Sequence, residues 1–595
     1  MLTIDVAFLL IGQLMLLNSL RFIALAAFAA LAGFAPPFDL AYADNVKPKE
    51  SAPAPTGSEA VTDEAAVVEA ADKPVPVDRM RQMQQEAMTN LHADWGFWGF
   101  APDRYSTWVK HSNRLIPVYT FGLTLDRLRQ EGSVYSDRAR LEKLYGRVPE
   151  GSLVDDAPYF DQTDIYRLQQ RAVADGKTQI ILIVFDGMDW QSTYNAALYR
   201  NGSVTYTAGR GNGLVFQDYR GTVTDFGAVV TSPRLAGCRT DVDAQTVLDG
   251  DKPATGGYDP SRGGRAPGEP TNKHEYLMGL DQTQPHTVTD SAASATSMTT
   301  GIKTYNDAIN FNVAGDRVET IAHQLQRERG FAIGVVTSVP ISHATPACAY
   351  AQNVSRDDYQ DITRDLIGLP SASHKRDPLP GVDVLIGGGW GEPKRKDAKQ
   401  GENFVPGREF FDPEDFRRVS VENGGKYVVA QRTSGRSGPE VLDQATRAAI
   451  AGSHRLVGIF GAAAGHLPFA TADGNFDPAL DAQGEKKYSA GDVSENPVLA
   501  DMAKSALNVL EQDKDGFWLM VEAGDVDWAN HANNIDSSIG AVFSGDAAVK
   551  AVFDWVDSRQ GWNKTAVIVT SDHGHYFVLK NPQAIALAGQ KQPPN

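Results

Sequence analysis

The stretch QIILIVFD (179–186) places an uninterrupted apolar run directly before an aspartate. An apolar run without alternation is typical of a strand that is buried on both faces. Further runs of this kind lie at 331–337, 382–386, 456–460, 517–521 and 565–570. Helix-like stretches such as 318–329 and 498–512 separate them. We therefore expect an α/β fold whose mainly parallel central sheet is flanked by helices on both faces.

The first 77 residues differ in composition from this pattern. An apolar run, 22–34, is followed by the small-x-small sequence Ala41, Tyr42, Ala43. This order predicts a signal peptide over residues 1–43, with export to the periplasm or the exterior and no stable membrane insertion after cleavage. A retained membrane anchor is the alternative, although the run is short for a span. Residues 44–77 are rich in Ala, Pro, Glu and Asp and predict a disordered linker.

The remainder divides into two predicted parts. Residues 78–170 are expected to form an N-terminal extension that packs on the core, and residues 171–595 the main domain. The aromatic side chains of 92–120 fit packing anchors better than a carbohydrate platform. Two stretches within the main domain, 231–285 and 392–440, read as loop insertions over the scaffold.

Charge and cysteine content exclude several classes of function. The formal net charge is −18, so no basic surface is expected that would bind nucleic acid. A phosphorylated substrate is still compatible, because bound divalent cations reverse the local field. Two cysteines, Cys238 and Cys348, are too few for a disulfide framework or a cysteine-based zinc site. Two unpaired buried thiols are favoured slightly over a single bridge.

Polar residues collect where the predicted strands end. They are Asp186, His343, Thr345, Glu522, Asp572 and His573. One aspartate after a strand is commonly only a helix cap, but four strands deliver such groups, and ligands bind outside the carboxyl ends of parallel sheets. Asp527 and His531 are four residues apart, so on a helix they share a face and can hold one metal. Oxygen and imidazole ligands suit zinc, magnesium or manganese.

A candidate nucleophile lies in TDSAASAT (289–296). The small residues after Ser291 predict a tightly packed helix that begins near it. A serine at a helix N-terminus meets free N–H groups and the positive end of the dipole, which favours a phosphoryl group. A simple N-cap is an equally good interpretation of the local sequence.

Several longer segments resemble those of the alkaline phosphatase family and stand in the same order. TDSAASATSMTTGIKTYN (289–306) is similar to the family's nucleophile segment almost residue for residue. The others are FDGM (185–188), SHATPACAYAQNVSR (342–356), VDVLIGGG (382–389), GFWLMVEAGDVDWANHANN (516–534) and TSDHGH (570–575). Together they span residues 179–577.

The resemblance implies hydrolysis of small phosphate monoesters through a phosphoserine at Ser291, with Arg356 binding two phosphate oxygens. It implies that Asp186, Asp572 and His573 hold the metal that activates Ser291. Asp527 and His531 would hold a second zinc, and Asp186, Thr345 and Glu522 a third metal, usually magnesium, near His343. It leaves a homodimer open.

Two departures from the family pattern stand out. His343 occupies a position where some members have aspartate and others histidine, which leaves the identity of the third metal open. The second zinc of the family also has a histidine ligand well downstream, whereas no histidine follows His575 here. We expect a truncated or frameshifted end, with a shift of His575 into the gap as the alternative. A phosphodiesterase is one competing function. Because of the missing ligand, a catalytically impaired metal- or phosphate-binding protein is the other.

Overall fold

The fold comes from a computed structural model that describes residues 78–221, 227–230, 238–249, 256–260, 274–279, 287–462 and 465–590. The predicted signal peptide and linker lie outside the described residues. Within the described part of the chain, no helix is both long enough and apolar enough to cross a bilayer.

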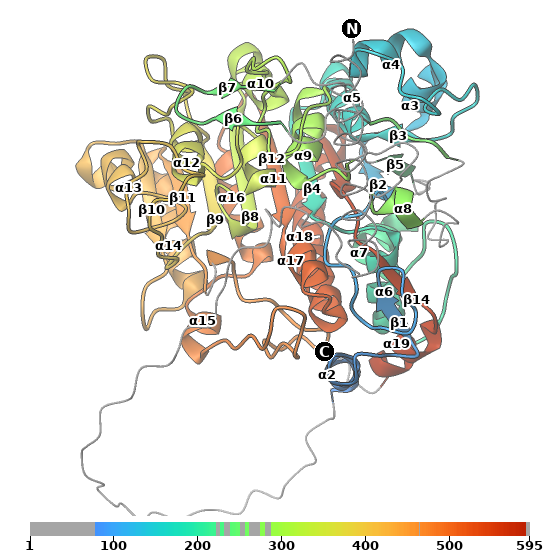
Figure 1. The fold of residues 1–595 in the computed structure, drawn as a ribbon. Coiled ribbons are helices and arrows are strands. Elements are labelled where there is room, and N and C mark those ends of the chain that lie inside the picture. The colour runs from blue at the N-terminus through green and yellow to red at the C-terminus, as the bar shows by residue number, and fades with distance from the viewer. Residues whose placement is uncertain are drawn as a thin grey trace, which may run out of the picture. The chain divides into compact units, whose positions relative to one another are not determined.

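One large sheet organises the described residues (Figure 1). Its ten strands lie in the order β10-β11-β9-β8-β12-β4-β13-β2-β5-β3. Their bounds are β2 (Ile116–Phe121), β3 (Phe160–Asp161), β4 (Gln179–Phe185), β5 (Gly227–Val230), β8 (Ala332–Pro340), β9 (Val384–Gly388), β10 (Tyr427–Gln431), β11 (Arg455–Ile459), β12 (Phe517–Ala523) and β13 (Thr565–Thr570). From β10 to β13 all neighbours are parallel, whereas β2 is antiparallel to both β13 and β5. The predicted α/β fold with a mainly parallel sheet is confirmed.

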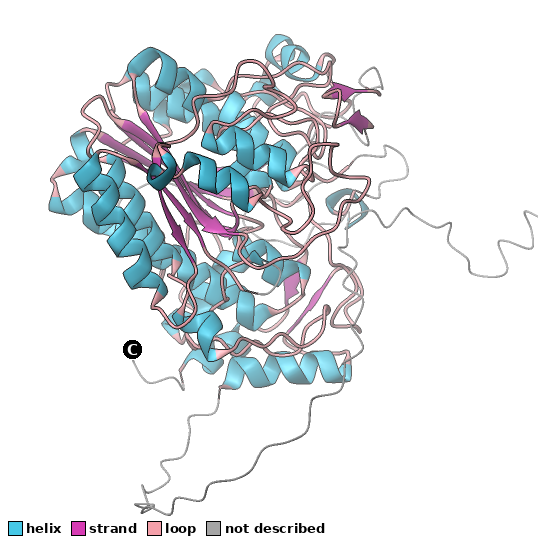
Figure 2. Cartoon of the chain, turned by 90° about the vertical axis from the view of Figure 1, so that its left-hand side faces the viewer, coloured by secondary structure: helices cyan, strands magenta, loops and turns pink. Residues whose placement is uncertain are grey.

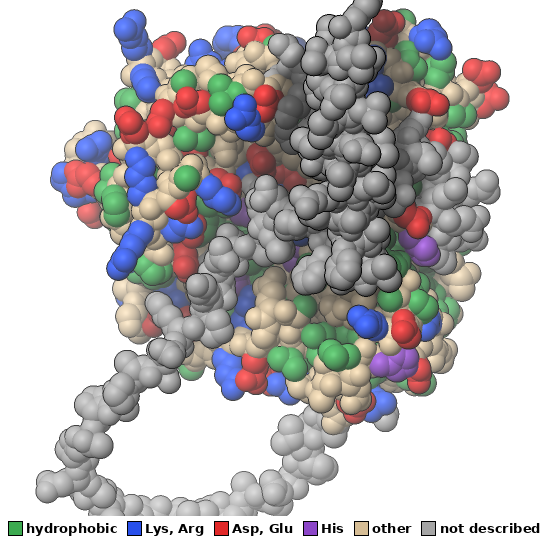
Figure 3. Space-filling model, viewed as in Figure 1, with side chains coloured by type: hydrophobic (Ala, Val, Ile, Leu, Met, Phe, Trp, Pro, Cys, Tyr) green, Lys and Arg blue, Asp and Glu red, His purple; other side chains and the backbone are tan. Residues whose placement is uncertain are grey.

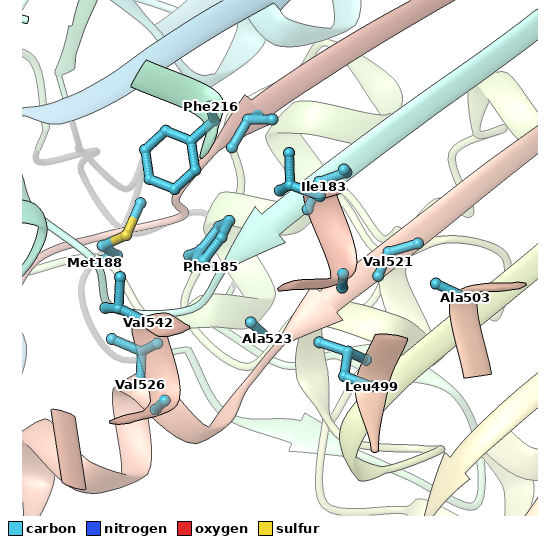
Figure 4. Close-up of a cluster of buried hydrophobic side chains, with 14 of the residues drawn as sticks. Ile183, Phe185, Met188, Phe216, Leu499, Ala503, Val521, Ala523, Val526 and Val542 are labelled. Carbon is cyan, nitrogen blue, oxygen red and sulfur yellow. The ribbon is translucent and has the colours of Figure 1, made fainter. Parts of the chain in front are cut away.

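The central strands are buried on both faces because their alternate side chains enter two separate hydrophobic clusters. In β4, Ile181, Ile183 and Phe185 join one cluster, and the residues between them join the other. Figure 4 shows Ile183 and Phe185 packed near Phe216 and Val521 in the first cluster. Burial on both sides removes any need for polar positions, which explains the uninterrupted apolar run.

Helices cover both faces of the sheet (Figure 2). α14, α16 and α18 contact one face, and α5, α10 and α11 contact the other, with α9 packed on α5 and α11. The bounds of these helices are α5 (Gln162–Ala174), α9 (Ser291–Thr300), α10 (Ile321–Arg329), α11 (Ala344–Cys348), α14 (Gly438–Gly452), α16 (Leu499–Leu510) and α18 (Ile535–Ser558). The helices expected over 318–329 and 498–512 correspond to α10 and α16.

Eleven further α-helices and two small strand pairs are found in the described part of the chain. The other helices are α2 (Arg79–Asn90), α3 (Asp126–Glu131), α4 (Arg138–Tyr145), α6 (Trp190–Asn201), α7 (Val215–Asp218), α8 (His274–Leu277), α12 (Tyr359–Ile367), α13 (Pro413–Val419), α15 (Ala490–Ser494), α17 (Asp525–His531) and α19 (Pro582–Gly589). Two small antiparallel pairs join β1 (Gly96–Trp98) to β14 (Phe577–Leu579) and β6 (Thr240–Asp241) to β7 (Thr246–Val247).

Four strands of the main sheet, β2, β3, β5 and β10, arise where no strand was expected. β2 and β3 come from the segment 78–170, and β10 lies inside 392–440, which is therefore not all insertion. β2 reads IPVYTF, with a proline and a threonine, and β10 is only partly buried at the sheet edge. Neither has the continuous apolar run of a central strand, so periodicity does not reveal them.

Two smaller expectations concern the aromatic and cysteine residues. Trp98 and Tyr105 are fully buried, and Trp98 packs against Phe577, as packing anchors should. Cys238 and Cys348 are both free thiols, Cys348 buried and Cys238 partly exposed. On the face drawn in Figure 3, acidic and basic side chains are intermixed over the described surface rather than gathered by sign.

Gly540 provides a test of how closely α18 packs on the backbone of residues 470 and 471. A Cβ at this position of α18 would overlap the carbonyl group of Ala470 and lie 2.6 Å from the carbonyl carbon of Thr471. We expect Gly540→Ala to lower the free energy of unfolding by ~1–3 kcal/mol, because backbone cannot move aside cheaply. The control Gly491→Ala meets only the flexible Glu495 carboxylate at 3.3 Å and should change it by less than ~1 kcal/mol. Equal effects in urea unfolding would contradict this packing.

Candidate active site

The carboxylates predicted at strand ends come together at one edge of the sheet. Asp186 follows β4, Glu522 is the penultimate residue of β12, and Asp572 lies two residues beyond β13. The three strands are parallel neighbours, so their carboxyl ends meet. All three side chains are fully buried. Buried carboxylates need compensating positive charge or protons, and this requirement governs the rest of the site.

The first ligand cluster consists of Asp186, Asp572 and His573. Their ligand atoms all lie within 4.8 Å of one another. His573 Nε2 is 3.3 Å from Asp186 Oδ1 and 3.5 Å from Asp572 Oδ2. Asp572 Oδ1 accepts hydrogen bonds from the N–H groups of Gly187 and His573, both at 2.9 Å. Asp572 Oδ2 and Asp186 Oδ2 are buried and accept none. Such orphaned oxygens next to an imidazole fit a divalent cation.

Ser291 stands at the first position of α9 and faces this cluster. Its Oγ is 3.1 Å from His573 Nε2 and 3.4 Å from Asp186 Oδ1. The capping role belongs to Asp290, whose Oδ1 accepts a hydrogen bond from the Ala293 N–H at 2.9 Å. Ser291 is therefore not the N-cap. Its hydroxyl is left at the positive end of the helix dipole, beside the ligand cluster.

A second ligand cluster forms on α17. Asp527 and His531 lie one turn apart on this helix, as their spacing predicted, with Oδ1 3.4 Å from Nε2. His575 Nε2 lies 2.7 Å from the same Oδ1. His573 Nε2 of the first cluster is 3.9 Å from that oxygen, so the two clusters are adjacent.

The second cluster also contains His111, which sequence reasoning missed. The ligand atoms of His111, Asp527, His531 and His575 all lie within 4.8 Å of one another. His111 comes from the segment that was expected only to pack on the core. No local motif singles it out: it precedes β2, and only the antiparallel pairing of β2 with β13 carries it to the carboxyl edge.

Arg356 and His343 lie beside the start of α9. Arg356 Nη1 donates a hydrogen bond to Asp290 Oδ2 at 3.1 Å, and Nη2 is 3.3 Å from His343 Nε2. His343 precedes α11 and is partly buried. Burial and the neighbouring guanidinium lower the pKa of His343 to about 3, so its ring is neutral. Its Nδ1 has no hydrogen-bond partner.

Glu522 and Thr345 form a third group of candidate metal ligands. Glu522 Oε2 accepts a hydrogen bond from Thr337 Oγ1. Glu522 Oε1 and Thr345 Oγ1 are buried and have no partner, which fits the oxygen ligands of a hard cation. Burial and the nearby carboxylates raise the pKa of Glu522 to about 8.

The two clusters differ in electrostatics. Burial and the neighbouring acids hold the pKa values of Asp186 and Asp572 well above the ordinary range. Burial alone would also raise that of Asp527, but the histidines around it hold its pKa well below the ordinary value. The acids of the first cluster thus favour binding of a proton or a cation, whereas Asp527 is already surrounded by imidazoles.

Comparison with known proteins places these features in a family. The family model for alkaline phosphatase matches residues 259–592. Alkaline phosphatase 3 of Bacillus subtilis (strain 168) is 30% identical over 310 residues, which cover 51% of this chain and 54% of that protein. Alkaline phosphatase of Escherichia coli (strain K12) is 30% identical over 323 residues, covering 52% and 63%. The chain spans little more than half the length of these curated relatives.

Solved structures of alkaline phosphatases also match part of the chain. The crystal structure of a cold-active alkaline phosphatase from a psychrophilic Shewanella is 21% identical, with a TM-score of 0.39, covering 67% of this chain and 68% of that one. The fold and site define an α/β protein with a buried serine between clusters of carboxylates and histidines. Because the family model covers more than half of the sequence, the chain belongs to the alkaline phosphatase family. Asp186 and His111 precede the matched residues.

After removal of metal, the free energy of unfolding should fall as the pH rises. The raised pKa of Glu522 means that the folded, metal-free protein binds a proton that the unfolded chain releases near pH 4.5. Its free energy of unfolding therefore falls as pH rises towards about 8, by ~1.4 kcal/mol per pH unit for each such carboxyl. Above about pH 6.5 the histidines of the unfolded chain no longer titrate, so this loss stands alone.

We expect the chelated protein to lose stability between about pH 6.5 and 8 in urea unfolding. Glu522→Gln should have a shallower slope over the same range, because one titrating group is gone. A chelated protein whose stability is flat or rises across this interval would contradict the arrangement of buried carboxylates.

Proposed function

We propose that this protein hydrolyses small phosphate monoesters through a phosphoserine at Ser291. The observation that carries the proposal is the position of Ser291 Oγ, at the N-terminus of α9 and 3.1 Å from His573 Nε2. A hydroxyl in this place meets a phosphoryl group that the helix N-terminus already attracts. Membership of the alkaline phosphatase family supports the same reaction.

Arg356 would bind the transferred phosphoryl group. A guanidinium binds two oxygens in one plane, a geometry that lysine cannot reproduce. Asp290 Oδ2 accepts from Arg356 Nη1 at 3.1 Å and thereby positions the guanidinium beside Ser291. The side chain of Arg356 is only 7% exposed, so its charge acts in a partly dehydrated pocket where it is strong. A terminal phosphate, with two charged oxygens to offer, suits this arrangement better than a diester.

The donor sets fit three divalent cations. Asp186, Asp572 and His573, with Ser291, would hold one zinc, and Asp527 and His531 a second. Asp186, Thr345 and Glu522 would hold magnesium, with His343 near it. The unpartnered oxygens of Asp186, Thr345, Glu522 and Asp572 support these assignments. Such cations supply positive charge that favours ionised oxygen nucleophiles and stabilises the phosphoryl oxygens.

The reaction then runs in two displacements. Ser291 Oγ loses its proton and forms a bond to phosphorus while the bond to the ester oxygen breaks, and the alcohol leaves with a proton. A water molecule attacks the phosphoserine, the Ser291 oxygen leaves and regains a proton, and inorganic phosphate is released. The charge that develops on the phosphoryl oxygens faces Arg356 and the N–H groups at the start of α9.

The location of the reaction is proposed from sequence alone. The apolar run 22–34 and the sequence around Ala43 support export to the periplasm or the exterior. Sedimentation of the exported protein would measure whether it forms a homodimer.

Replacement of the nucleophile tests the function. We expect Ser291→Ala to lower kcat on p-nitrophenyl phosphate at least ~10³-fold while bound metal is retained. Ser297→Ala is a matched control, because the Ser297 hydroxyl only donates to the Ala293 carbonyl of its own helix, and it should remain active. Retained turnover by Ser291→Ala would refute the proposal.

The same assay separates the competing functions. Faster hydrolysis of bis-p-nitrophenyl phosphate than of the monoester would identify a phosphodiesterase. Bound metal without hydrolysis of either ester would identify a metal- or phosphate-binding protein.

His343 offers a test of the third metal site. His343→Asp places a carboxylate two residues before Thr345, whose Oγ1 has no hydrogen-bond partner, and magnesium prefers oxygen ligands. We expect more magnesium per chain by elemental analysis after equilibration with zinc and magnesium. The exposed His454 serves as control, since His454→Asp makes the same chemical change away from the site. Unchanged metal content and activity in His343→Asp would contradict this assignment.

A further inference from the structure

His111 reaches the second ligand cluster through the topology of the sheet. β2 runs antiparallel to β13, so its start lies at the edge where the parallel strands end. The backbone just ahead of β2 is fixed there: the Ser112 N–H donates to the Gly574 carbonyl at 2.8 Å and Ser112 Oγ to the His575 carbonyl at 2.9 Å. These bonds place residue 111 directly against the loop that carries His573 and His575.

The imidazole of His111 is oriented by its other nitrogen. His111 Nδ1 lies 3.1 Å from the Thr289 carbonyl oxygen, and only an N–H can bond to a carbonyl. The hydrogen of a neutral ring is therefore on Nδ1, and Nε2 carries a lone pair. The ring also stacks on His573, with centroids 3.7 Å apart. A carbonyl behind the ring is the usual way in which a ligating histidine is held.

His531 is held in the same way. Its Nδ1 bonds to the Val109 carbonyl oxygen, two residues ahead of His111, so its Nε2 also carries a lone pair. The two Nε2 atoms face each other at 3.0 Å. Asp527 Oδ1 lies 3.6 Å from His111 Nε2 and 3.4 Å from His531 Nε2. Two lone pairs and a carboxylate oxygen directed at one point need a cation between them.

His575 has a different relation to this point. Its Nε2 lies 2.7 Å from Asp527 Oδ1, the distance of an N–H donating to a carboxylate. That nitrogen then carries the hydrogen and has no lone pair to offer. His575 thus orients Asp527 rather than serving as a ligand itself.

We propose that His111 is the third protein ligand, with Asp527 and His531, of a zinc ion in the second cluster. The ligand comes from a segment that precedes β4 and lies outside residues 259–592, whereas the family resemblance places such a histidine after the last cluster. Two imidazoles and a carboxylate make a three-ligand zinc site with a position left for water or substrate. The proposal rests on the proposed function for the identity of the metal.

Metal binding by the full chain tests the ligand. We expect His111→Ala to bind one zinc fewer per chain by elemental analysis, with an affinity for that zinc at least ~100-fold weaker in competition with a chromophoric chelator. His575→Ala should keep the zinc, weakened ~10–100-fold as for an outer partner. His92→Ala is the matched control, because exposed His92 of the same segment pairs only with Asp94 and the Asp103 carbonyl, and it should bind as the wild type does.

A spectroscopic variant separates ligation from folding. His111→Cys loaded with cobalt(II) should gain a thiolate-to-cobalt charge-transfer band in the near ultraviolet, which a purely structural role for residue 111 would not produce. Wild-type zinc content and affinity in His111→Ala, or no such band in His111→Cys, would overturn the proposal. Loss of the zinc in His575→Ala alone would also overturn it.

The assay with p-nitrophenyl phosphate keeps the two proposals apart. Zinc binding that depends on His111 in a wild-type protein without turnover would sink the phosphatase function and leave the ligand in place. Turnover by the wild type with zinc binding independent of His111 would do the reverse.

Discussion

Repulsion among buried carboxylates at the carboxyl edge of the sheet is the constraint on which the site depends. Asp186 and Asp572 come from the ends of neighbouring strands, and both pKa values are raised by burial and by the acids around them. Glu522 adds a third such group. A protein that only needed stability would not gather these groups, because each costs several kcal/mol unless it is compensated. The surroundings accordingly direct positive charge to this edge, through the start of α9 and Arg356.

The same edge gives Ser291 the surroundings that the proposed reaction needs. Asp290 satisfies the helix N-terminus and anchors Arg356, so one carboxylate both caps α9 and positions the guanidinium. Ser291 is thereby free of the capping role. Its Oγ lies between the start of α9 and the first cluster, where the helix N-terminus and Arg356 would attract an incoming dianionic phosphate.

The second cluster depends on a strand that runs against its neighbours. His111 and His531 are 420 residues apart in sequence and meet because β2 pairs with β13. The aromatic stretch ahead of β2 therefore does more than pack on the hydrophobic core. It supplies the imidazole of His111 to the second ligand cluster, and its Val109 carbonyl orients the imidazole of His531 in the same cluster.

Local patterns predicted much of this architecture. The continuous apolar runs correspond to the central strands, because a strand that is buried on both faces has apolar side chains at every position. The four-residue spacing of Asp527 and His531 predicted their shared helix face, since that geometry is local.

The features that the sequence could not reveal depend on pairing between distant strands, or on which of two adjacent residues caps a helix. β2 contains Pro117 and Thr120, and its burial comes from partners hundreds of residues away. His111 therefore has no detectable signal. Asp290 and Ser291 are both good N-caps, and only the bond from the Ala293 N–H to Asp290 distinguishes them.

Anomalous diffraction at the zinc edge from crystals of the zinc-loaded protein would test the central claim most directly. We expect two peaks about 3.5–4 Å apart. One should lie among Asp186, Asp572 and His573, and the other among Asp527, His531 and the Nε2 atom of His111. A second peak bound by His575 with His111 turned away, or no peak in either cluster, would contradict it.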